Sequence, residues 1–166
     1  MKFYLCRHAI AVAATPDISD ALRPLAPEGV RKFRRVARGL AALDPEIDWI
    51  LASPLVRAKQ TAEILAEELE GRDKTALALK LEPSLAPPGD ILALLVRLRE
   101  MDGKIRGAIA VGHEPILSSW IGQLCFGRTG NCEMKKGAVA AVELDTKTGH
   151  GTLLFLLQPA HFRQFQ

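Results

Sequence analysis

Near its N-terminus the chain reads Lys2-Phe3-Tyr4-Leu5-Cys6-Arg7-His8, a short apolar run that ends in a cation and an imidazole. The run has the length and composition of a buried β-strand, so Arg7 and His8 stand at its carboxyl end. A second such run, Ala108-Ile109-Ala110-Val111-Gly112, leads into His113 in the same way. If the two strands are parallel neighbours, both histidines lie at the edge where open α/β sheets bind their ligands.

A third strand end adds another arginine to this edge. The strand-like run Asp48-Trp49-Ile50-Leu51-Ala52 is followed by Ser53-Pro54-Leu55-Val56-Arg57-Ala58. Ser53-Pro54 predicts the N-cap and first-turn proline of a helix that runs to about Leu69. Arg57 then lies in the first helical turn, where the helix dipole favours an anion.

Strand-like and helix-like segments alternate along the rest of the chain, which predicts an α/β fold. We expect three layers, with a central, mostly parallel sheet between helices and an antiparallel C-terminal edge. The expected segments are a loop over Ala9–Leu25, a helix over Pro27–Leu43, a strand over Ala76–Glu82, a loop over Pro83–Gly89, a helix from Asp90, a helix over Pro115–Leu124, and a hairpin of Val139–Leu144 with Thr152–Leu157.

The composition is that of an ordinary globular protein, and its 166 residues predict one domain over residues 1–166. The net charge of +3 with spread basic residues argues against a nucleic-acid partner. The arginines of the first helix are expected to form a solvated face. No apolar stretch is long enough to span a membrane, and the N-terminus lacks the pattern of a signal peptide. Three cysteines without a C-x-x-C pair predict reduced thiols in a cytoplasmic protein.

The two histidines and two arginines at the sheet edge fit phosphoryl transfer. A phosphoryl group in transfer spreads negative charge over its oxygens, and arginine binds two of them at once without losing its charge. A neutral imidazole is a competent nucleophile, and nearby arginines lower its pKa. His8 fits the nucleophile, and His113 fits a donor or cation to a transferring oxygen. No cluster has metal-ligand spacing, so we expect neither a metal nor another cofactor. His150 and His161 are expected at the surface.

With these residues, the chain resembles the histidine phosphatase (phosphoglycerate mutase-like) superfamily, and within it the small bacterial phosphohistidine phosphatases. Four stretches carry the resemblance: Leu5-Cys6-Arg7-His8-Ala9, Leu22-Arg23-Pro24-Leu25, Ser53-Pro54-Leu55-Val56-Arg57-Ala58-Lys59-Gln60-Thr61-Ala62 and Val111-Gly112-His113-Glu114-Pro115. The resemblance implies a phosphoglycerate mutase-like fold. It also implies His8 as nucleophile, Arg7, Arg57 and His113 around the phosphate, and Arg23 at the mouth of the pocket.

Three residues depart from the pattern of the family. Ala9 replaces a glycine, which would cost stability if that backbone needed a positive φ. Ala26 replaces a threonine and removes a side-chain cap from the first helix. Glu114 follows the second histidine, where the acid-phosphatase branch has an aspartate that donates a proton. Its alternative role is to open the helix that begins at Pro115.

Three functions are consistent with these residues. The first is hydrolysis of phosphohistidine on a protein, which needs no strong acid because the leaving imidazole is readily protonated. The second is hydrolysis of a phosphomonoester on a small metabolite or phosphoprotein, with Glu114 as the acid. The third is a non-catalytic phosphate-binding module. We favour the first, because the segment Leu85–Asp90 lacks the acid that phosphomonoesterases of the family carry there and because the short loop Ala9–Leu25 predicts an open pocket.

Overall fold

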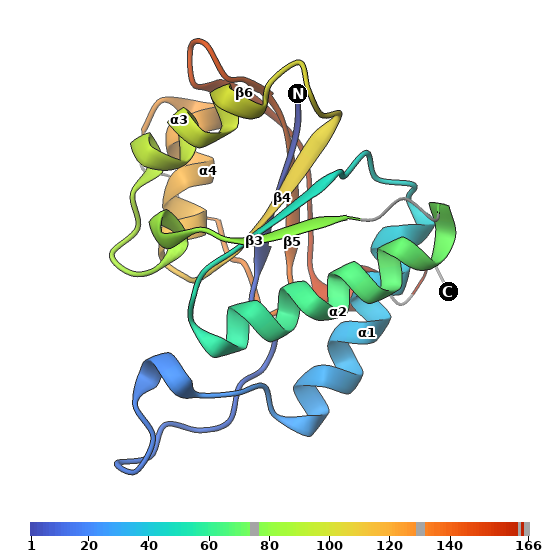
Figure 1. The fold of residues 1–166 in the computed structure, drawn as a ribbon, viewed down its shortest axis with the longest axis vertical. Helices are drawn as coiled ribbons and strands as arrows, with labels where there is room; N and C mark the ends of the chain where they lie inside the picture. Colours follow the sequence, from blue (N-terminus) through green and yellow to red (C-terminus); the bar gives the residue numbers. More distant parts are fainter. Residues whose placement is uncertain (74–76, 129–131, 163, 165–166) are drawn as a thin grey trace.

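The computed structural model describes residues 1–73, 77–128, 132–162 and 164 and forms a mixed sheet between two layers of helices (Figure 1). Its strands are β1 (Lys2–Arg7), β2 (Trp49–Ala52), β3 (Ala78–Leu81), β4 (Gly107–Gly112), β5 (Val139–Asp145) and β6 (His150–Leu157). They lie in the order β3-β2-β4-β1-β5-β6. The first four strands are mutually parallel, whereas β5 is antiparallel to β1 and β6. The predicted fold class is therefore confirmed.

The helices divide between the two faces of the sheet. They are α1 (Pro27–Ala42), α2 (Val56–Asp73), α3 (Ile91–Met101), α4 (Ile116–Phe126) and the short α5 (Pro159–Phe162). One hydrophobic cluster joins α1, α2 and α5 to the sheet, and a second cluster joins α3 and α4 to the other face. Figure 1 shows α1 and α2 together on one side of the strands and α3 and α4 on the other.

The strand β1 serves both clusters, because successive side chains of a strand point to opposite faces. Tyr4 and Cys6 belong to the cluster beneath α1 and α2, whereas Phe3 and Leu5 belong to the cluster beneath α3 and α4. This burial on both faces explains why the run in the sequence is apolar throughout rather than alternating.

Two helix starts follow from their sequences, and one differs from the prediction. Asp90 caps α3 by accepting a hydrogen bond from the N–H of Ala93 at 3.0 Å. Ala26 occupies the cap position of α1 without a side-chain hydrogen bond, as expected. The prediction that Ser53-Pro54 starts α2 was wrong, because the helix begins at Val56. The Ser53 hydroxyl is engaged with His113 instead.

Several short elements were absent from the prediction. The loop after β1 contains a 3₁₀ turn over Asp20–Leu22, and a second turn over Pro83–Leu85 begins the next expected loop. The predicted strand start at Ala76 lies outside the described residues. Ala9 is absent from the positions with positive φ, so its replacement of glycine carries no backbone strain. In the part of the chain that is described, no helix is both long and apolar enough to cross a bilayer.

Candidate active site

The sheet register brings the two predicted histidines together. The parallel pairing of β1 with β4 sets Arg7 opposite Gly112, so the next residues on the two strands are His8 and His113. Their ring centroids lie 5.1 Å apart, and both side chains are buried. The loop of residues 9–25 extends beyond this edge, below the sheet in Figure 1. The carboxyl ends of β1 and β4 therefore form the centre of the candidate site.

His8 is held as a neutral imidazole with one protonated and one unprotonated nitrogen. Its Nδ1 lies 2.7 Å from the carbonyl oxygen of Ala9 and donates a hydrogen bond to it. The proton is then on Nδ1, and Nε2 keeps its lone pair. Burial lowers the pKa of His8 to about 3, and positive charge on His113, Arg57 and Arg7 acts in the same direction, against the Ala9 hydrogen bond. At pH 7 the ring is consequently neutral, as the predicted role of nucleophile requires.

His113 carries the complementary arrangement. The hydroxyl of Ser53 lies 2.8 Å from its Nε2, and this hydroxyl also accepts a 3.4 Å contact from the N–H of Leu55. We assign the Ser53 hydroxyl as the donor to Nε2, which places the imidazole proton on Nδ1. That Nδ1 is buried without a hydrogen-bond partner. Burial, together with Arg57, lowers the pKa of His113 to about 4. The result is a neutral N–H donor beside His8.

Arg57 joins the histidines to the loop after β1. Its Nε lies 3.3 Å from the Nε2 of His8, and its two terminal nitrogens contact the backbone oxygen and the carboxylate of Asp20 at 2.6 and 2.9 Å. Arg57 is only 5% exposed. The guanidinium is therefore fixed in orientation against Nε2 of His8.

Arg23 reaches this cluster through the same carboxylate. Its Nε and Nη2 contact Asp20 at 2.9 and 2.6 Å, and its Nη1 donates to the carbonyl oxygen of Val12. The hydrogen bonds from Arg23 are the largest cause of a lowered pKa of Asp20, and those from Arg57 lower it further. Asp20 is thus an ionised bridge between the two arginines, and Arg23 lies one step further from His8 than Arg57 does.

Arg7 has one bonded nitrogen and one buried nitrogen without a partner. Its Nη1 donates to the carbonyl oxygen of Met134 at 2.7 Å, whereas its Nε is the second unpartnered buried side-chain nitrogen among the described residues. Positive charge on Arg7 contributes to the lowered pKa of both His8 and His113, which locates it near both rings. The site thus has two unsatisfied N–H donors, on Arg7 and His113, that an oxyanion would satisfy.

The remaining polar residues of the segment after Arg57 hold the loop in place. Thr61 is fully buried; its hydroxyl donates to the carbonyl oxygen of Arg57 at 2.6 Å and accepts from the N–H of Ala9 at 3.1 Å. The side-chain oxygen of Gln60 accepts from the N–H of Leu25 at 2.7 Å. Thr61 and Gln60 therefore hold the two ends of the loop, at Ala9 and at Leu25, from positions shortly after Arg57 in α2.

Glu114 is engaged with the helix that follows it. Its carboxylate accepts hydrogen bonds from the backbone N–H of Ser118 at 3.2 Å and from the Ser118 hydroxyl at 2.5 Å. These contacts correspond to the helix-opening role rather than to a carboxylic acid directed at His8. Glu114 also lies near Cys132. Burial raises the pKa of the Cys132 thiol, and the charge of Glu114 raises it further.

Sequence reasoning did not identify Asp20 or the role of Ser53. Asp20 lies three residues before Arg23, a spacing that brings the two side chains together on a single 3₁₀ turn. Ser53 follows directly after β2, which pairs with β4, and this adjacency was a signal for contact with His113. Among the described residues no group of three or more His, Cys, Asp or Glu side chains is arranged to hold a metal ion.

Comparison with known proteins agrees with this geometry. The family model of the histidine phosphatase superfamily (branch 1) matches residues 3–86. Phosphohistidine phosphatase SixA of Escherichia coli K12 is 28% identical over 164 residues, which cover 98% of this chain and 97% of SixA. An uncharacterised protein of Picosynechococcus sp. is 35% identical over 84% of this chain and 82% of its own length.

Solved structures give the same picture of the fold. A structure of the protein histidine phosphatase SixA complexed with tungstate superposes with a TM-score of 0.83 at 28% identity, over 97% of this chain and 99% of that one. Phosphoglycerate mutase from Bacillus anthracis superposes with a TM-score of 0.73 at 13% identity, over 99% and 96% of the two chains. The family model and the relatives agree, and the chain belongs to branch 1 of the histidine phosphatase superfamily.

Proposed function

We propose that the protein hydrolyses phosphohistidine on a protein substrate, with His8 as the covalent nucleophile. The observation that carries the proposal is the state of His8: a buried, neutral imidazole whose unprotonated Nε2 accepts a hydrogen bond from the Nε–H of Arg57 at 3.3 Å and whose ring lies beside that of His113. Similarity to the phosphohistidine phosphatase SixA over nearly the full length of both chains supports a phosphatase of this kind.

The proposed reaction has two steps. In the first, Nε2 of His8 attacks the phosphorus, a bond forms between them, and the bond from phosphorus to the substrate imidazole breaks. The leaving imidazole takes a proton from solvent. In the second, water attacks the phosphorus of the enzyme phosphohistidine and releases inorganic phosphate and neutral His8. Arg57, Arg7 and the Nδ1–H of His113 stabilise the charge on the phosphoryl oxygens in both steps.

The carboxylates near the site favour a nitrogen leaving group over an alcohol. An alkoxide needs a carboxylic acid to protonate it as it leaves. Asp20 bridges two arginines that lower its pKa, so it is ionised at pH 7 and holds no proton to give. The carboxylate of Glu114 is hydrogen-bonded to Ser118. A histidine nitrogen needs no such acid, and phosphohistidine is the substrate that fits this environment.

The proposed partner is a histidine-phosphorylated protein, the class of substrate that similarity to the protein histidine phosphatase SixA supports. The three cysteines are free thiols, the state expected in a reducing compartment, and we propose that the protein acts in the cytoplasm.

A substrate comparison tests the function. Phosphate release is measured from a phosphohistidine peptide and from an alkyl phosphate, with wild type, His8→Ala and the surface control His150→Ala. We expect wild type and the control to prefer the phosphohistidine peptide and His8→Ala to lose turnover of both. A preference for the alkyl phosphate would favour the phosphomonoesterase alternative. Binding without turnover of either substrate would favour a phosphate-binding module.

A further inference from the structure

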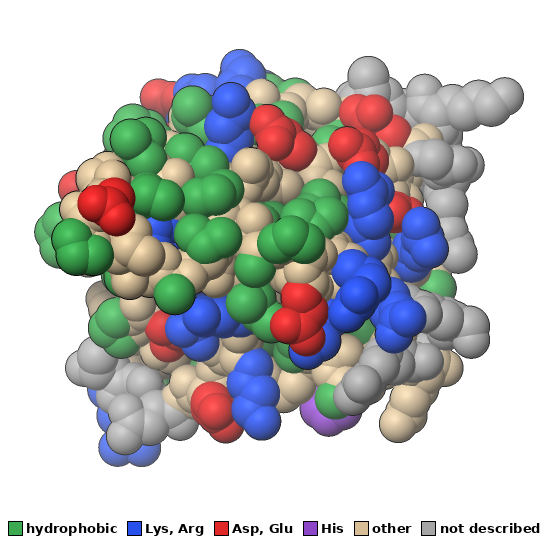
Figure 2. Space-filling view, turned by 90° about the horizontal axis from the view of Figure 1, so that it is seen from below, with side chains coloured by type: hydrophobic (Ala, Val, Ile, Leu, Met, Phe, Trp, Pro, Cys, Tyr) green, Lys and Arg blue, Asp and Glu red, His purple; other side chains and the backbone are tan. Residues whose placement is uncertain are grey.

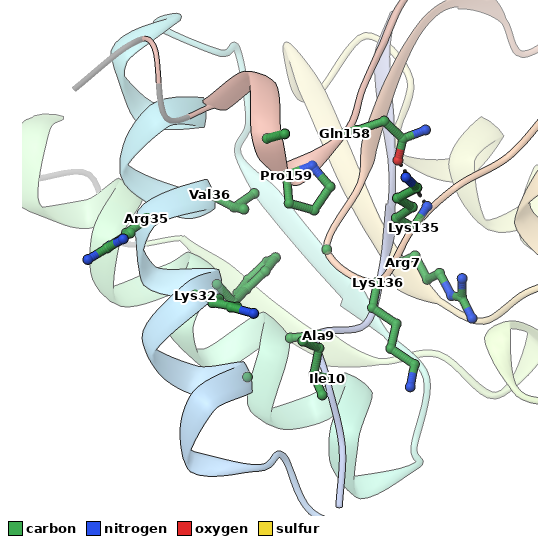
Figure 3. A pocket seen from close by; sticks show the side chains of 14 residues that line it. Arg7, Ala9, Ile10, Lys32, Arg35, Val36, Lys135, Lys136, Gln158 and Pro159 are labelled. Carbon is green, nitrogen blue, oxygen red and sulfur yellow. Dashed lines mark hydrogen bonds between the residues drawn. The ribbon is translucent and has the colours of Figure 1, made fainter.

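A pocket of about 600 Å³ lies directly beside the candidate site, on the side of α1. This volume is within the range of ligand-binding pockets in proteins. Arg7 and Ala9, the two chain neighbours of His8, both line it. Figure 3 shows the pocket between α1 and the segment that carries Lys135 and Lys136. The pocket therefore adjoins the chain on both sides of His8, although the side chain of His8 does not line it.

The base of this pocket is apolar. Phe33 and Val36 of α1 are almost fully buried there, and Ile10 and Pro159 complete the apolar lining. Such a surface favours an apolar side chain over water.

The rim of the pocket is cationic. Lys32, Lys135 and Lys136 line it together with Arg7, and none of the described residues that line it is acidic. In Figure 3 Lys32 points from α1 toward the segment of Lys136, while Arg35 points away from the space between them. Lys32 also pairs with Glu28 at 2.6 Å, but both side chains are more than half exposed, so this pair is weak and exchangeable.

Positive charge also characterises the wider surface here. Figure 2 looks onto the end of the molecule where β1, β2 and β4 finish, and Lys and Arg side chains gather on the side where α1 and α2 lie in Figure 1. Acidic side chains lie among these cations (Figure 2), and Arg34 and Arg38 of α1 pair with Glu68 of α2, so the attraction for an acidic ligand comes mainly from the lysines of the rim.

Close backbone contacts show that the pocket is preformed. A Cβ atom on Gly29 would lie 2.0 Å from the carbonyl oxygen of Ile10, so only glycine lets α1 approach the segment after His8 this closely. Gly137 has a φ of +84° and donates its N–H to the carbonyl oxygen of Arg7. Gln158 accepts from the N–H of Lys135 at 3.0 Å and ties that segment to the end of β6. The walls are fixed by these contacts and need no ligand to form.

We propose that this pocket, which we call the α1 pocket, binds an acidic segment of the phosphorylated protein that carries an apolar side chain close to its phosphohistidine. Carboxylates of the segment complement Lys32, Lys135 and Lys136, and the apolar side chain contacts Ile10 and Pro159, which line the pocket and are partly exposed. The inference rests on the proposed function, because the segment must belong to the molecule whose phosphohistidine is at His8. Substrate choice then depends on the residues that flank the phosphohistidine as well as on the phosphoryl group.

Two synthetic peptides test the α1 pocket. Both carry a central phosphohistidine; one has Glu, Asp and Leu in its flanks, and the other has Lys and Ser at the same positions. Phosphate release gives kcat/KM for each peptide with wild type, with the double variant Lys32→Ala/Lys136→Ala, and with the matched control Lys104→Ala/Lys147→Ala. The two control lysines are exposed and lie outside the α1 pocket. Phosphoramidate, which has no flanks, reports whether the reacting site is intact.

We expect wild type and the control to prefer the acidic peptide by about tenfold at low salt, with the preference falling as ionic strength rises. The Lys32→Ala/Lys136→Ala variant should lose most of this preference while its phosphoramidate turnover stays near that of wild type. Equal kcat/KM for the two peptides with wild type would overturn the inference, as would a preference that survives the double variant. If wild type cleaves phosphoramidate and neither peptide, the inference also fails. If it cleaves none of the three, the proposed function itself is wrong.

Discussion

At the scale of single residues, the two histidines are alike in charge and opposite in hydrogen bonding. Both are neutral at pH 7, because burial lowers their pKa values to about 3 and about 4. The carbonyl oxygen of Ala9 fixes the proton of His8 on Nδ1, and the hydroxyl of Ser53 engages Nε2 of His113. One ring therefore offers a lone pair and the other an N–H. In the proposed reaction the lone pair attacks the phosphorus and the N–H stabilises charge on a phosphoryl oxygen.

The two arginines bridged by Asp20 should differ in their effect on turnover. Arg57 contacts His8, so Arg57→Ala should lower kcat/KM by about 10²- to 10³-fold. Arg57→Lys should also be poor, because a point charge does not replace a planar fork. Arg23→Ala should be milder and raise KM more than it lowers kcat. Steady-state kinetics with phosphoramidate measure these effects, with the exposed Arg31→Ala as control. An Arg23→Ala defect as large as that of Arg57→Ala would show that Arg23 contacts the phosphoryl group directly.

Glu114→Gln should leave phosphoramidate hydrolysis within a few-fold of wild type. The amide oxygen of glutamine still accepts a hydrogen bond from Ser118, so the first turn of α4 keeps its contact. If Glu114 instead protonates an alcohol leaving group, the variant should lose roughly 10²- to 10⁴-fold in phosphomonoester hydrolysis. Parallel assays on both substrates, with circular dichroism to verify the fold, measure the outcome. A large loss of phosphomonoesterase activity in a folded variant would contradict our choice of substrate class.

At the scale of elements, the best-predicted segments are those whose local sequence pattern agrees with their burial and contacts in the folded protein. β1 and β4 are apolar throughout because both faces are buried, and α3 has both a capping aspartate and helical spacing. The start of α2 was predicted wrongly because Ser53-Pro54 has the local pattern of a cap, whereas the serine hydroxyl serves a histidine 60 residues away. Asp20 was missed for the same reason: its contact with Arg57 exists only after the loop folds back.

Thr61→Val tests whether α2 holds the segment after His8. The substitution conserves shape and removes the hydroxyl that accepts the N–H of Ala9. Since that N–H is buried, we expect a loss of about 1–3 kcal/mol in the free energy of unfolding. Urea denaturation measures it, with the exposed Thr152→Val as a control that should change by no more than about 0.5 kcal/mol. Equal stability of Thr61→Val and wild type would show that another group accepts this hydrogen bond.

At the scale of the whole molecule, the strand order assembles the site from distant parts of the chain. Because β1 lies between β4 and β5, and β4 lies between β1 and β2, residues near positions 8, 57 and 113 meet at a single edge. The same order brings the segment of residues 134–137 against Arg7. The site therefore exists only in the folded sheet, and its electrostatics are coupled to global stability.

The stability of the protein should fall as the pH drops from 6.5 toward 4. Unfolded histidines bind protons below their usual pKa of about 6.5, whereas folded His8 and His113, with lowered pKa values, stay neutral; acid therefore favours the unfolded chain. Between pH 6.5 and 5 each histidine should account for on the order of 1–2 kcal/mol. Denaturation at several pH values measures this, and His8→Gln/His113→Gln should show a shallower fall than wild type or His150→Gln. A fall equally steep in all three proteins would place the titrating groups elsewhere.

The central claim is that the phosphoryl group passes through Nε2 of His8. Mixing the protein with excess phosphohistidine peptide, quenching it during turnover and measuring its intact mass and fragments locates any phosphoryl group on the chain. We predict one phosphoryl group per molecule during turnover, attached to His8, and its absence together with turnover from His8→Ala. Sustained turnover by His8→Ala, or wild-type turnover with the label on another residue, would contradict the account.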